Sequence, residues 1–293
     1  MPKSILVTGA NGQLGSELRQ LSNVATGFVF TFVTRDELDL SDSEAIQAWL
    51  SDKTYDVIIN CAAYTAVDKA EAEPELARAI NATAIETLAR IAKAKKSALI
   101  HVSTDYVFDG KNCKPYVESD PTNPQGIYGL TKREGEQALL AINPAKSIII
   151  RTSWVYSSFG SNFVKTMLRL GREREELGVI YDQVGSPTSA RDLALAILAI
   201  IQHPKFYTLA STEIVHFSNE GVCSWYDFAK AIFEYSKIDC QIKPIETKDY
   251  PTPAIRPHYS LLNKTKIKKS FDLNTPYWKD SLHDCLDLLI GNK

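Results

Sequence analysis

The sequence predicts an α/β fold in which a doubly wound parallel sheet is followed by a smaller C-terminal lobe. Two observations support this class. Short, almost continuously apolar runs alternate with helical stretches in the first half of the chain, which is typical of a parallel sheet covered on both faces. After residue 150 the alternation loosens, and loops rich in proline and glycine separate the remaining helical pieces.

Each expected strand is a β-rich run followed by a turn or a helical stretch. The runs are SILVTG from residue 4, FVFTFVT from 28, DVIINCAA from 56, SALIHVST from 97 and SIIIRTSWVY from 147. The clearest helix spans residues 74–96, because a proline opens it and lysines close it. Strands and helices in this order predict successive βαβ units.

Composition limits the classes of function. The chain has 293 residues, 44% of them hydrophobic, and a formal net charge of −2, so it has no electrostatic footprint for nucleic acid. The lysine cluster at 264–269 is interpreted as a solvated segment. The longest apolar run, 193–201, is far shorter than the roughly 20 residues of a membrane span. The first residues lack the apolar core of a signal peptide.

The spacing of the cysteines and histidines indicates the cellular compartment and argues against a metal site. The five cysteines are widely spaced and form no CxxC pair, which favours reduced thiols in a cytoplasm over a disulfide framework. The five histidines lack the spacing of a metal site. We therefore expect a cytoplasmic protein that binds neither a membrane nor nucleic acid and holds no metal.

The stretch TGANGQLG, residues 8–15, lies between the first strand and the first helix. Gly9, Gly12 and Gly15 can form a tight turn, let the backbone approach a pyrophosphate and pack helix against strand. The spacing is GxxGxxG, and a turn that needs flexible backbone is the alternative. At the first βα turn of an alternating chain, the triplet predicts a dinucleotide site. We expect residues 1–150 to form this Rossmann-type domain, with segments near 172–200 returning to it, and 151–293 to form mainly the substrate lobe.

The end of the second strand, VTRDELDL, should contact the adenosine ribose. Arg35 is placed to pair with a 2′-phosphate, whereas Asp36 or Asp39 can accept hydrogen bonds from ribose or adenine groups. A solvated loop of mixed charge is the alternative. Arg35 favours NADPH, with NADH also accepted.

A second constellation is YGLTK, which places Tyr128 and Lys132 one above the other on a helix face. An ammonium beside a phenol favours its ionised form, so the pair can pass a proton near neutral pH. The alternative is an amphipathic helix with a tyrosine on its core side. Thr104, at the carboxyl end of the fourth strand, favours the catalytic interpretation because strand ends line the ligand crevice of such sheets.

These residues resemble the extended short-chain dehydrogenases/reductases, and within them the branch that reduces dTDP-linked 4-keto-6-deoxy sugars. The resemblance covers nearly the whole chain. It is carried by TGANGQLG, DELDL, NCAAYTAVDKAE, STDYVFDG, YGLTKREGE, RTSWVYS, DQVGSPT and the RP at 256–257. Each motif alone is weak, and together they are highly specific.

The resemblance implies roles for individual residues. Thr104, Tyr128 and Lys132 form the catalytic trio. The cofactor-binding residues it implies, in addition to Tyr128 and Lys132, are Gly9, Asn11, Gly12, Gln13, Leu14, Gly15, Asp39, Leu40, Ala62, Ala63 and Tyr64, with Arg35 added from the strand-end argument. The substrate-binding residues are Thr65, Val67, Thr104, Asp105, Trp154 and Arg256, with the DQVGSPT loop near the nucleotide. Val67 as a helix start and Trp154 as a core residue remain alternatives.

The implied reaction is reduction of the C4 keto group of the sugar. Hydride comes from the reduced nicotinamide and the proton from Tyr128, while Thr104 orients the oxygen and Lys132 binds the ribose and lowers the tyrosine's pKa. A dehydratase is disfavoured, since Tyr106 and not glutamate follows Asp105. A related nucleotide-sugar 4-reductase, an epimerase and a non-catalytic subunit of the kind that regulates methionine adenosyltransferase remain alternatives. Either a monomer or a homodimer is expected.

Overall fold

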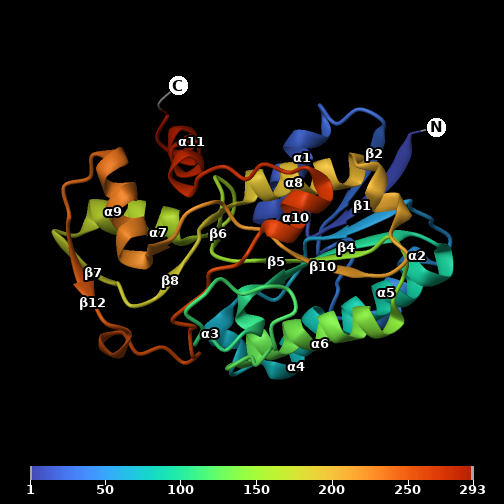
Figure 1. Cartoon of the computed structure of the whole chain (residues 1–293), viewed down its shortest axis with the longest axis horizontal. Coiled ribbons are helices and arrows are strands. Elements are labelled where there is room, and N and C mark those ends of the chain that lie inside the picture. Colours follow the sequence, from blue (N-terminus) through green and yellow to red (C-terminus); the bar gives the residue numbers. More distant parts are fainter. Residues whose placement is uncertain (1, 292–293) are drawn as a thin grey trace.

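The computed structural model describes residues 2–291 and contains a six-stranded parallel sheet with strand order β10-β5-β4-β3-β1-β2 (Figure 1). The strands are β1 (Lys3–Thr8), β2 (Phe28–Val33), β3 (Val57–Asn60), β4 (Ala98–Thr104), β5 (Ile148–Thr152) and β10 (Glu213–His216). The predicted doubly wound α/β class is confirmed. The chain runs outward from β1 to β2 and then returns to β3 on the other side of β1. This reversal is the topological switch point at which such sheets bind ligands.

Two details differ from the sequence-based elements. The run from 147 forms β5 and then the separate β6 (Val155–Tyr156), because Trp154 between them has φ of 50° and interrupts the extended backbone. The sixth strand, β10, lies in a region where the sequence showed only loosened order, and it pairs in parallel with β5.

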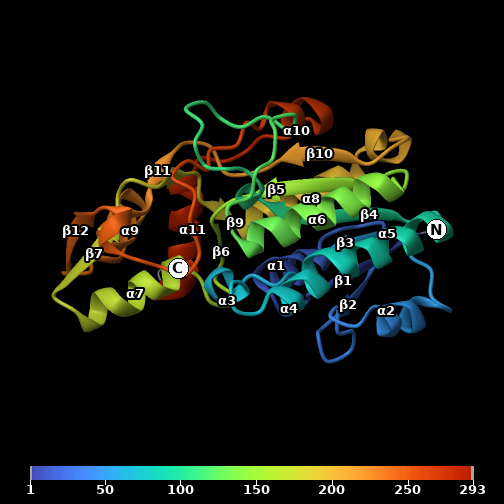
Figure 2. The ribbon, with the colours of Figure 1, turned by 90° about the horizontal axis from the view of Figure 1, so that it is seen from below.

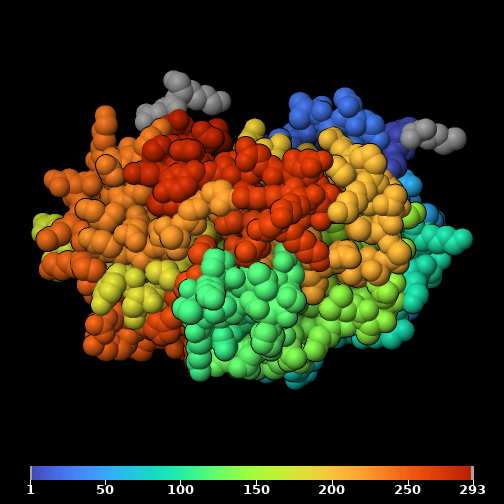
Figure 3. All heavy atoms as spheres, in the orientation of Figure 1, coloured from blue at the N-terminus to red at the C-terminus, as the bar shows by residue number. Residues whose placement is uncertain are grey.

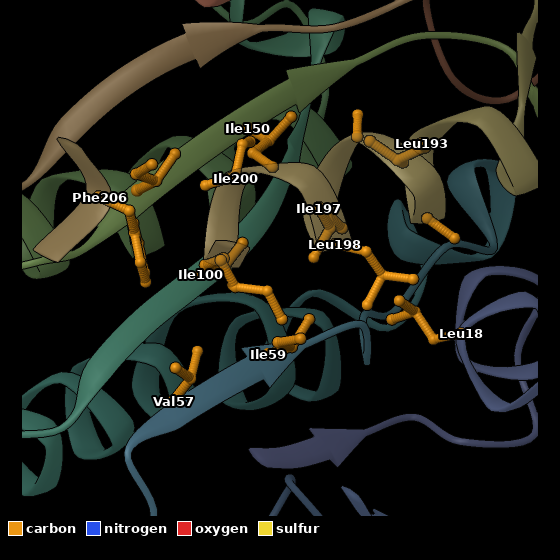
Figure 4. Packing of buried hydrophobic residues seen from close by; sticks show 14 of the residues in the cluster. Leu18, Val57, Ile59, Ile100, Ile150, Leu193, Ile197, Leu198, Ile200 and Phe206 are labelled. Carbon is orange, nitrogen blue, oxygen red and sulfur yellow. The ribbon is translucent and has the colours of Figure 1, made fainter. Parts of the chain in front are cut away.

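Helices cover both faces of the sheet. On one face lie α1 (Gln13–Ser22) and α8 (Ala190–Gln202), and on the other lie α2 (Ser43–Leu50), α5 (Ala84–Lys95) and α6 (Ile127–Ile142) (Figure 1). Alternate strand residues point to opposite faces. Figure 4 shows Ile59, Ile100 and Ile150 directed toward α8, whereas Ile58 and Leu99 belong to the core on the opposite face. The apolar runs are nearly continuous because both faces are buried.

The helix predicted over 74–96 is present but is not uniform. It consists of α4 (Pro74–Arg78), a π-helical turn (Ala79–Thr83) and α5. Lys96 closes it in the left-handed conformation at φ of 59°.

The second half of the chain builds a smaller lobe beside the sheet (Figure 2). Its helices are α7 (Phe163–Glu173), α9 (Trp225–Ser236) and α11 (Trp278–Ile290), and its largest strand pair is β7 (Glu176–Ile180) with β12 (Gln241–Ile245). Phe228, Ile232 and Leu282 are fully buried in its core. The chain passes directly from β5 through β6 into this lobe, which therefore adjoins the carboxyl edge of the sheet.

Shorter elements complete the fold. They are α3 (Val67–Ala70), α10 (Thr265–Phe271), β8 (Val184–Gly185), β9 (Thr188–Ser189) and β11 (Cys223–Ser224). In Figure 3 the loop of residues 110–125, in green, lies against the red C-terminal part of the chain, where Tyr116 N donates to Leu261 O at 2.9 Å. No helix within residues 2–291 combines the length and the apolar character needed to cross a bilayer.

Candidate active site

The glycine turn after β1 has the geometry of a phosphate cradle. Gly9 has φ of +67°, and a Cβ there would lie 2.7 Å from the backbone nitrogen of Ala62 on the neighbouring strand end. Gly12 is the N-cap of α1, and neither a side-chain cap nor an acidic side chain occupies that helix terminus. The backbone N–H groups of the first turn of α1 and the helix dipole suit an anion. The residues therefore fit a dinucleotide pyrophosphate.

The side chains next to these glycines have different surroundings. Asn11 is exposed, whereas Leu14 is buried in the core between α1 and the sheet. Gln13 accepts a hydrogen bond from Asn162 Nδ2 at 3.0 Å and so connects the turn to the lobe. Leu14 can face a cofactor only through its backbone.

At the end of β2 the charged residues lie at the surface. Arg35 Nε is 3.4 Å from Asp39 Oδ2, and the arginine side chain is 69% exposed. Asp39 also accepts from the backbone and hydroxyl of Ser41, and the backbone bond in particular holds the pKa of Asp39 below its usual value. Leu40 is buried under this turn. The guanidinium remains accessible to a phosphate.

The segment after β3 is held by a buried amide. Asn81 Oδ1 accepts from Tyr64 N at 2.9 Å and Asn81 Nδ2 donates to Tyr64 O at 3.1 Å. The Tyr64 hydroxyl donates to Glu73 at 2.6 Å. Ala62 and Ala63 follow β3 as partly exposed residues, and Ala62 lies next to Gly9, whereas Thr65 is exposed and Val67 opens α3.

Thr104 and Tyr128 come together at the carboxyl edge of the sheet. Thr104 ends β4, and its hydroxyl donates to Asp105 Oδ1 at 2.9 Å and accepts from Tyr106 N at 3.2 Å. Tyr128 lies in the first turn of α6, with its ring edge-on to Tyr106 at 5.4 Å. Burial raises the pKa of Tyr128 well above its ordinary value, and the Thr104 hydroxyl opposes this. The phenol therefore keeps its proton at neutral pH and can donate it.

The surroundings of Lys132 differ from those of Tyr128. Besides burial, the groups that act on the pKa of Tyr128 are Thr104, Asp105 and Tyr106, so the lowering of this pKa by Lys132 stays a prediction. Lys132 Nζ instead donates to Val102 O at 2.7 Å and lies 3.2 Å from His101 Nε2. Burial also lowers the pKa of Lys132 to about 8.

Asp105 and Arg256, which are far apart in the sequence, both lie near Tyr106. Burial raises the pKa of Asp105 to about 6, against the lowering effect of hydroxyl neighbours. Arg256 Nη2 is 2.6 Å from Asp68 Oδ2 on α3. This guanidinium also faces Tyr106 and lowers that phenol's pKa, while burial raises it overall to about 12.

Trp154 stands at the junction of the sheet and the lobe. Its ring stacks on Trp225 with centroids 3.6 Å apart, and a Cβ on Gly185 would lie 3.0 Å from it. Trp154 as a whole is partly exposed, and one face of its ring is covered by Trp225.

Sequence reasoning missed the residues that support this site. Asn60, Asn81 and His101 are buried polar side chains within segments that otherwise read as apolar strand or helix. A polar residue inside an apolar run was the available signal, since buried polar groups need partners. Among residues 2–291, no group of three or more His, Cys, Asp or Glu side chains is arranged to hold a metal.

Comparison with known proteins gives a consistent result along the chain. The family model described as the RmlD substrate binding domain matches residues 3–290. The dTDP-4-dehydrorhamnose reductase of Escherichia coli (strain K12) is 42% identical over 288 residues, which cover 94% of each chain.

Two solved structures are similar along their whole length. A dTDP-4-dehydrorhamnose reductase from Clostridium acetobutylicum ATCC 824 has a TM-score of 0.91 at 42% identity, covering 98% of this chain and 99% of that one. The enzyme from Bacillus anthracis str. Ames in complex with NADP also has a TM-score of 0.91, at 37% identity and the same coverage. The chain therefore belongs to the dTDP-4-dehydrorhamnose reductase family.

Proposed function

We propose that the protein reduces the C4 keto group of dTDP-4-dehydrorhamnose with NADPH and so forms dTDP-L-rhamnose. The observation that carries the proposal is the meeting of Thr104 and Tyr128 at the carboxyl edge of the sheet, the same edge at which the glycine turn follows β1. The names of the relatives identify the substrate class that this arrangement serves.

The residues that would hold the cofactor are those of the glycine turn, the β2 end and the segment 62–64. NADPH supplies the hydride when bound. Gly9, Gly12 and Gly15 give the pyrophosphate close access to backbone N–H groups. Arg35 pairs with the 2′-phosphate, which favours NADPH while NADH is still accepted. The NADP complex of the Bacillus anthracis relative supports this choice.

Proton transfer is the task of Tyr128 on α6, together with Thr104 at the end of β4. Tyr128 donates its phenolic proton to the C4 oxygen, because its high pKa keeps the phenol protonated. Thr104 orients the same oxygen through its hydroxyl. In its charged form Lys132 donates to the nicotinamide ribose. The enclosed surroundings exclude water from the reacting atoms.

The substrate residues belong to both parts of the molecule. Trp154 offers a flat surface to the deoxysugar, while Thr65, Val67 and Asp105 line the sugar side. Arg256 and the loop 182–188 approach the nucleotide. We retain the division into a cofactor domain, residues 1–150 with segments near 172–200, and a mainly sugar-binding lobe, 151–293. We also propose that the protein is cytoplasmic, which the five free cysteines support. A monomer or a homodimer completes the proposal.

A coupled assay tests the function. The purified chain should oxidise NADPH when dTDP-4-dehydrorhamnose is added, and NMR of the product should show a single configuration at C4. UDP-linked 4-keto sugars should react more slowly. An epimerase would instead retain tightly bound NAD, which is reduced and reoxidised within each cycle, and would show no net oxidation of NADPH. A non-catalytic subunit would consume no NADPH at all, which would refute the proposal.

A further inference from the structure

A chain of buried polar side chains connects the core of the sheet with Lys132. It starts at Thr8 at the end of β1, continues through Asn60 at the end of β3 and reaches His101 in β4. These four side chains are at most 1% exposed. The contacts are Thr8 Oγ1 to Asn60 Oδ1 at 2.5 Å, Asn60 Nδ2 to His101 Nδ1 at 3.0 Å and His101 Nε2 to Lys132 Nζ at 3.2 Å.

The orientation of the Asn60 amide fixes the direction of this chain. Asn60 Nδ2 also lies 3.3 Å from the carbonyl oxygen of Ala62, which can only accept a hydrogen bond. The amide nitrogen must therefore face both Ala62 and His101, and it donates to His101 Nδ1. Burial, and secondarily the charge of Lys132, lower the pKa of His101 well below 6.5, so the imidazole is neutral. Since Nδ1 accepts, the single ring proton is on Nε2.

This tautomer has a consequence for Lys132. An ammonium carries three donors and no acceptor, so a charged Lys132 would meet the Nε2–H of His101 donor against donor. An uncharged amine has a lone pair that accepts this hydrogen and can still donate to Val102 O, 2.7 Å away. The fixed imidazole therefore favours the uncharged amine.

The other charged groups near Lys132 are few. Glu136, one turn further along α6, favours the ammonium, but it is paired with Arg151 of β5 at 2.7 Å and also accepts from Ser103. Tyr128 is a further titratable group, one turn earlier on the same helix. Burial acts in the same direction as His101 and lowers the pKa of Lys132 to about 8.

We propose that His101 is a positioning residue of the reaction, whose Nε2–H, fixed by Asn60, weakens the hold of Lys132 on its proton. A buried amine that faces this N–H therefore loses its proton near the working pH rather than far above it. This loss of the proton sets the pH above which Lys132 no longer holds the ribose as a cation. This inference rests on the role of Lys132 in the proposed function.

The variant His101→Gln tests the proposal. Its amide can rotate to present an oxygen to the Lys132 ammonium, so the charged form is stabilised. The affinity for NADPH should fall above about pH 8 in the parent protein, and this fall should move up by roughly one pH unit in the variant. The alkaline limb of kcat/KM should move with it.

His216→Gln is the matched control. His216 is also fully buried and neutral, because burial lowers its pKa to about 3, but its Nδ1 faces Tyr116 O on the other side of β5. This variant should leave both pH profiles in place. A folded His101→Gln protein with the parent's profiles would overturn the inference. NADPH binding is measured without the sugar, so the inference remains testable if the proposed substrate is wrong.

A spectroscopic measurement addresses the tautomer directly. In protein labelled with ¹⁵N and ¹³C histidine, the His101 signal is the one that His101→Gln removes. If that variant does not fold, single substitutions of the other four histidines identify the signal by elimination. We expect the Nε2–H tautomer at about pH 9, where Lys132 is uncharged. The Nδ1–H tautomer at that pH would overturn the proposal.

Discussion

The surroundings of Tyr128 fit the general-acid role that we propose for it. Burial raises its pKa, so the phenol is protonated at neutral pH, and Thr104 beside it opposes the shift. Tyr128→Phe removes the proton and retains the ring. We expect kcat to fall by roughly 10²–10⁴, the usual contribution of a general acid, with NADPH affinity nearly unchanged. Steady-state assays and cofactor titration measure both, and near-normal turnover in a folded variant would exclude this role.

Asp105 should make stability depend on pH. Its pKa is about 6 in the folded protein against 3.8 in the reference state, so the folded protein binds more protons between these values. Stability is therefore greatest below about pH 4 with respect to this group and decreases as pH rises through 6. This difference in the pKa of Asp105 corresponds to a change of about 2–3 kcal/mol in the free energy of unfolding.

The variant Asp105→Asn tests this linkage. The free energy of unfolding, measured with urea between about pH 4 and 7, should decrease less with rising pH in the variant than in the parent protein. Asp36→Asn, at an exposed position, is the control and should follow the parent's curve. Parallel curves for the parent and Asp105→Asn would contradict the raised pKa.

In the proposed function, Arg35 selects between the two cofactors. Its ion pair with Asp39 is exposed and contributes little stability, so the guanidinium can turn to a phosphate at small cost. A charge-assisted contact contributes roughly 1.5–3 kcal/mol. Arg35→Ala should therefore raise KM for NADPH at least several-fold and leave KM for NADH nearly unchanged. An equal response with both cofactors would mean that Arg35 does not contact the 2′-phosphate.

At the scale of elements, the π-helical turn between α4 and α5 holds the segment that follows β3, which is part of the proposed cofactor site. It places Asn81, which is fully buried, against the backbone of Tyr64 and the hydroxyl of Thr131 at 3.2 Å. A Cβ on Gly135 would collide with the backbone oxygen of Asn81, which explains the close approach of α6. Irregular turns of this kind often occur at functional sites.

Asn81→Ala should therefore affect both stability and binding. It leaves buried partners on Tyr64 and Thr131 unsatisfied, at a cost of about 1–3 kcal/mol, and it frees the segment that follows β3. We expect a lower Tm and a several-fold higher KM for NADPH. Arg90→Ala, which removes an exposed ion pair from α5, is the control and should change neither. A lower Tm with an unchanged KM would show that the turn is only structural.

At the scale of the whole molecule, α3 and the C-terminal segment meet through Asp68. This carboxylate pairs with Arg256 at 2.6 Å and accepts from Ala254 N at 3.3 Å, although 186 residues separate the two positions in the second contact. Asp68→Asn should loosen Arg256 and raise KM for the nucleotide sugar several-fold, with KM for NADPH unchanged. Steady-state kinetics with each substrate varied in turn measures this. Lys243→Ala, which breaks an exposed ion pair in the lobe, should have no effect. An unchanged sugar KM in Asp68→Asn would separate Arg256 from substrate binding.

The sequence by itself determined the first five strands of the sheet and the glycine turn, because apolar runs, glycine triplets and helix ends are local patterns. The runs from 4, 28, 56 and 97 became strands β1 to β4, and Thr104 ends its strand as predicted. The neighbourhood of Tyr128 and Lys132 on one helix also follows from local periodicity. Family motifs added the substrate class, which no local pattern contains.

Only the tertiary structure decided which of these residues touch. The amine of Lys132 contacts His101 and Val102, because β4 packs beneath α6 and supplies both residues. Strand β10 joins the sheet because β5 presents a free edge to it, although only a short run marks it in the sequence. The Thr8–Asn60–His101 chain crosses three strands whose sequence separation is 41 residues or more. Such contacts depend on strand order and register, which a sequence pattern of period two or 3.6 does not encode.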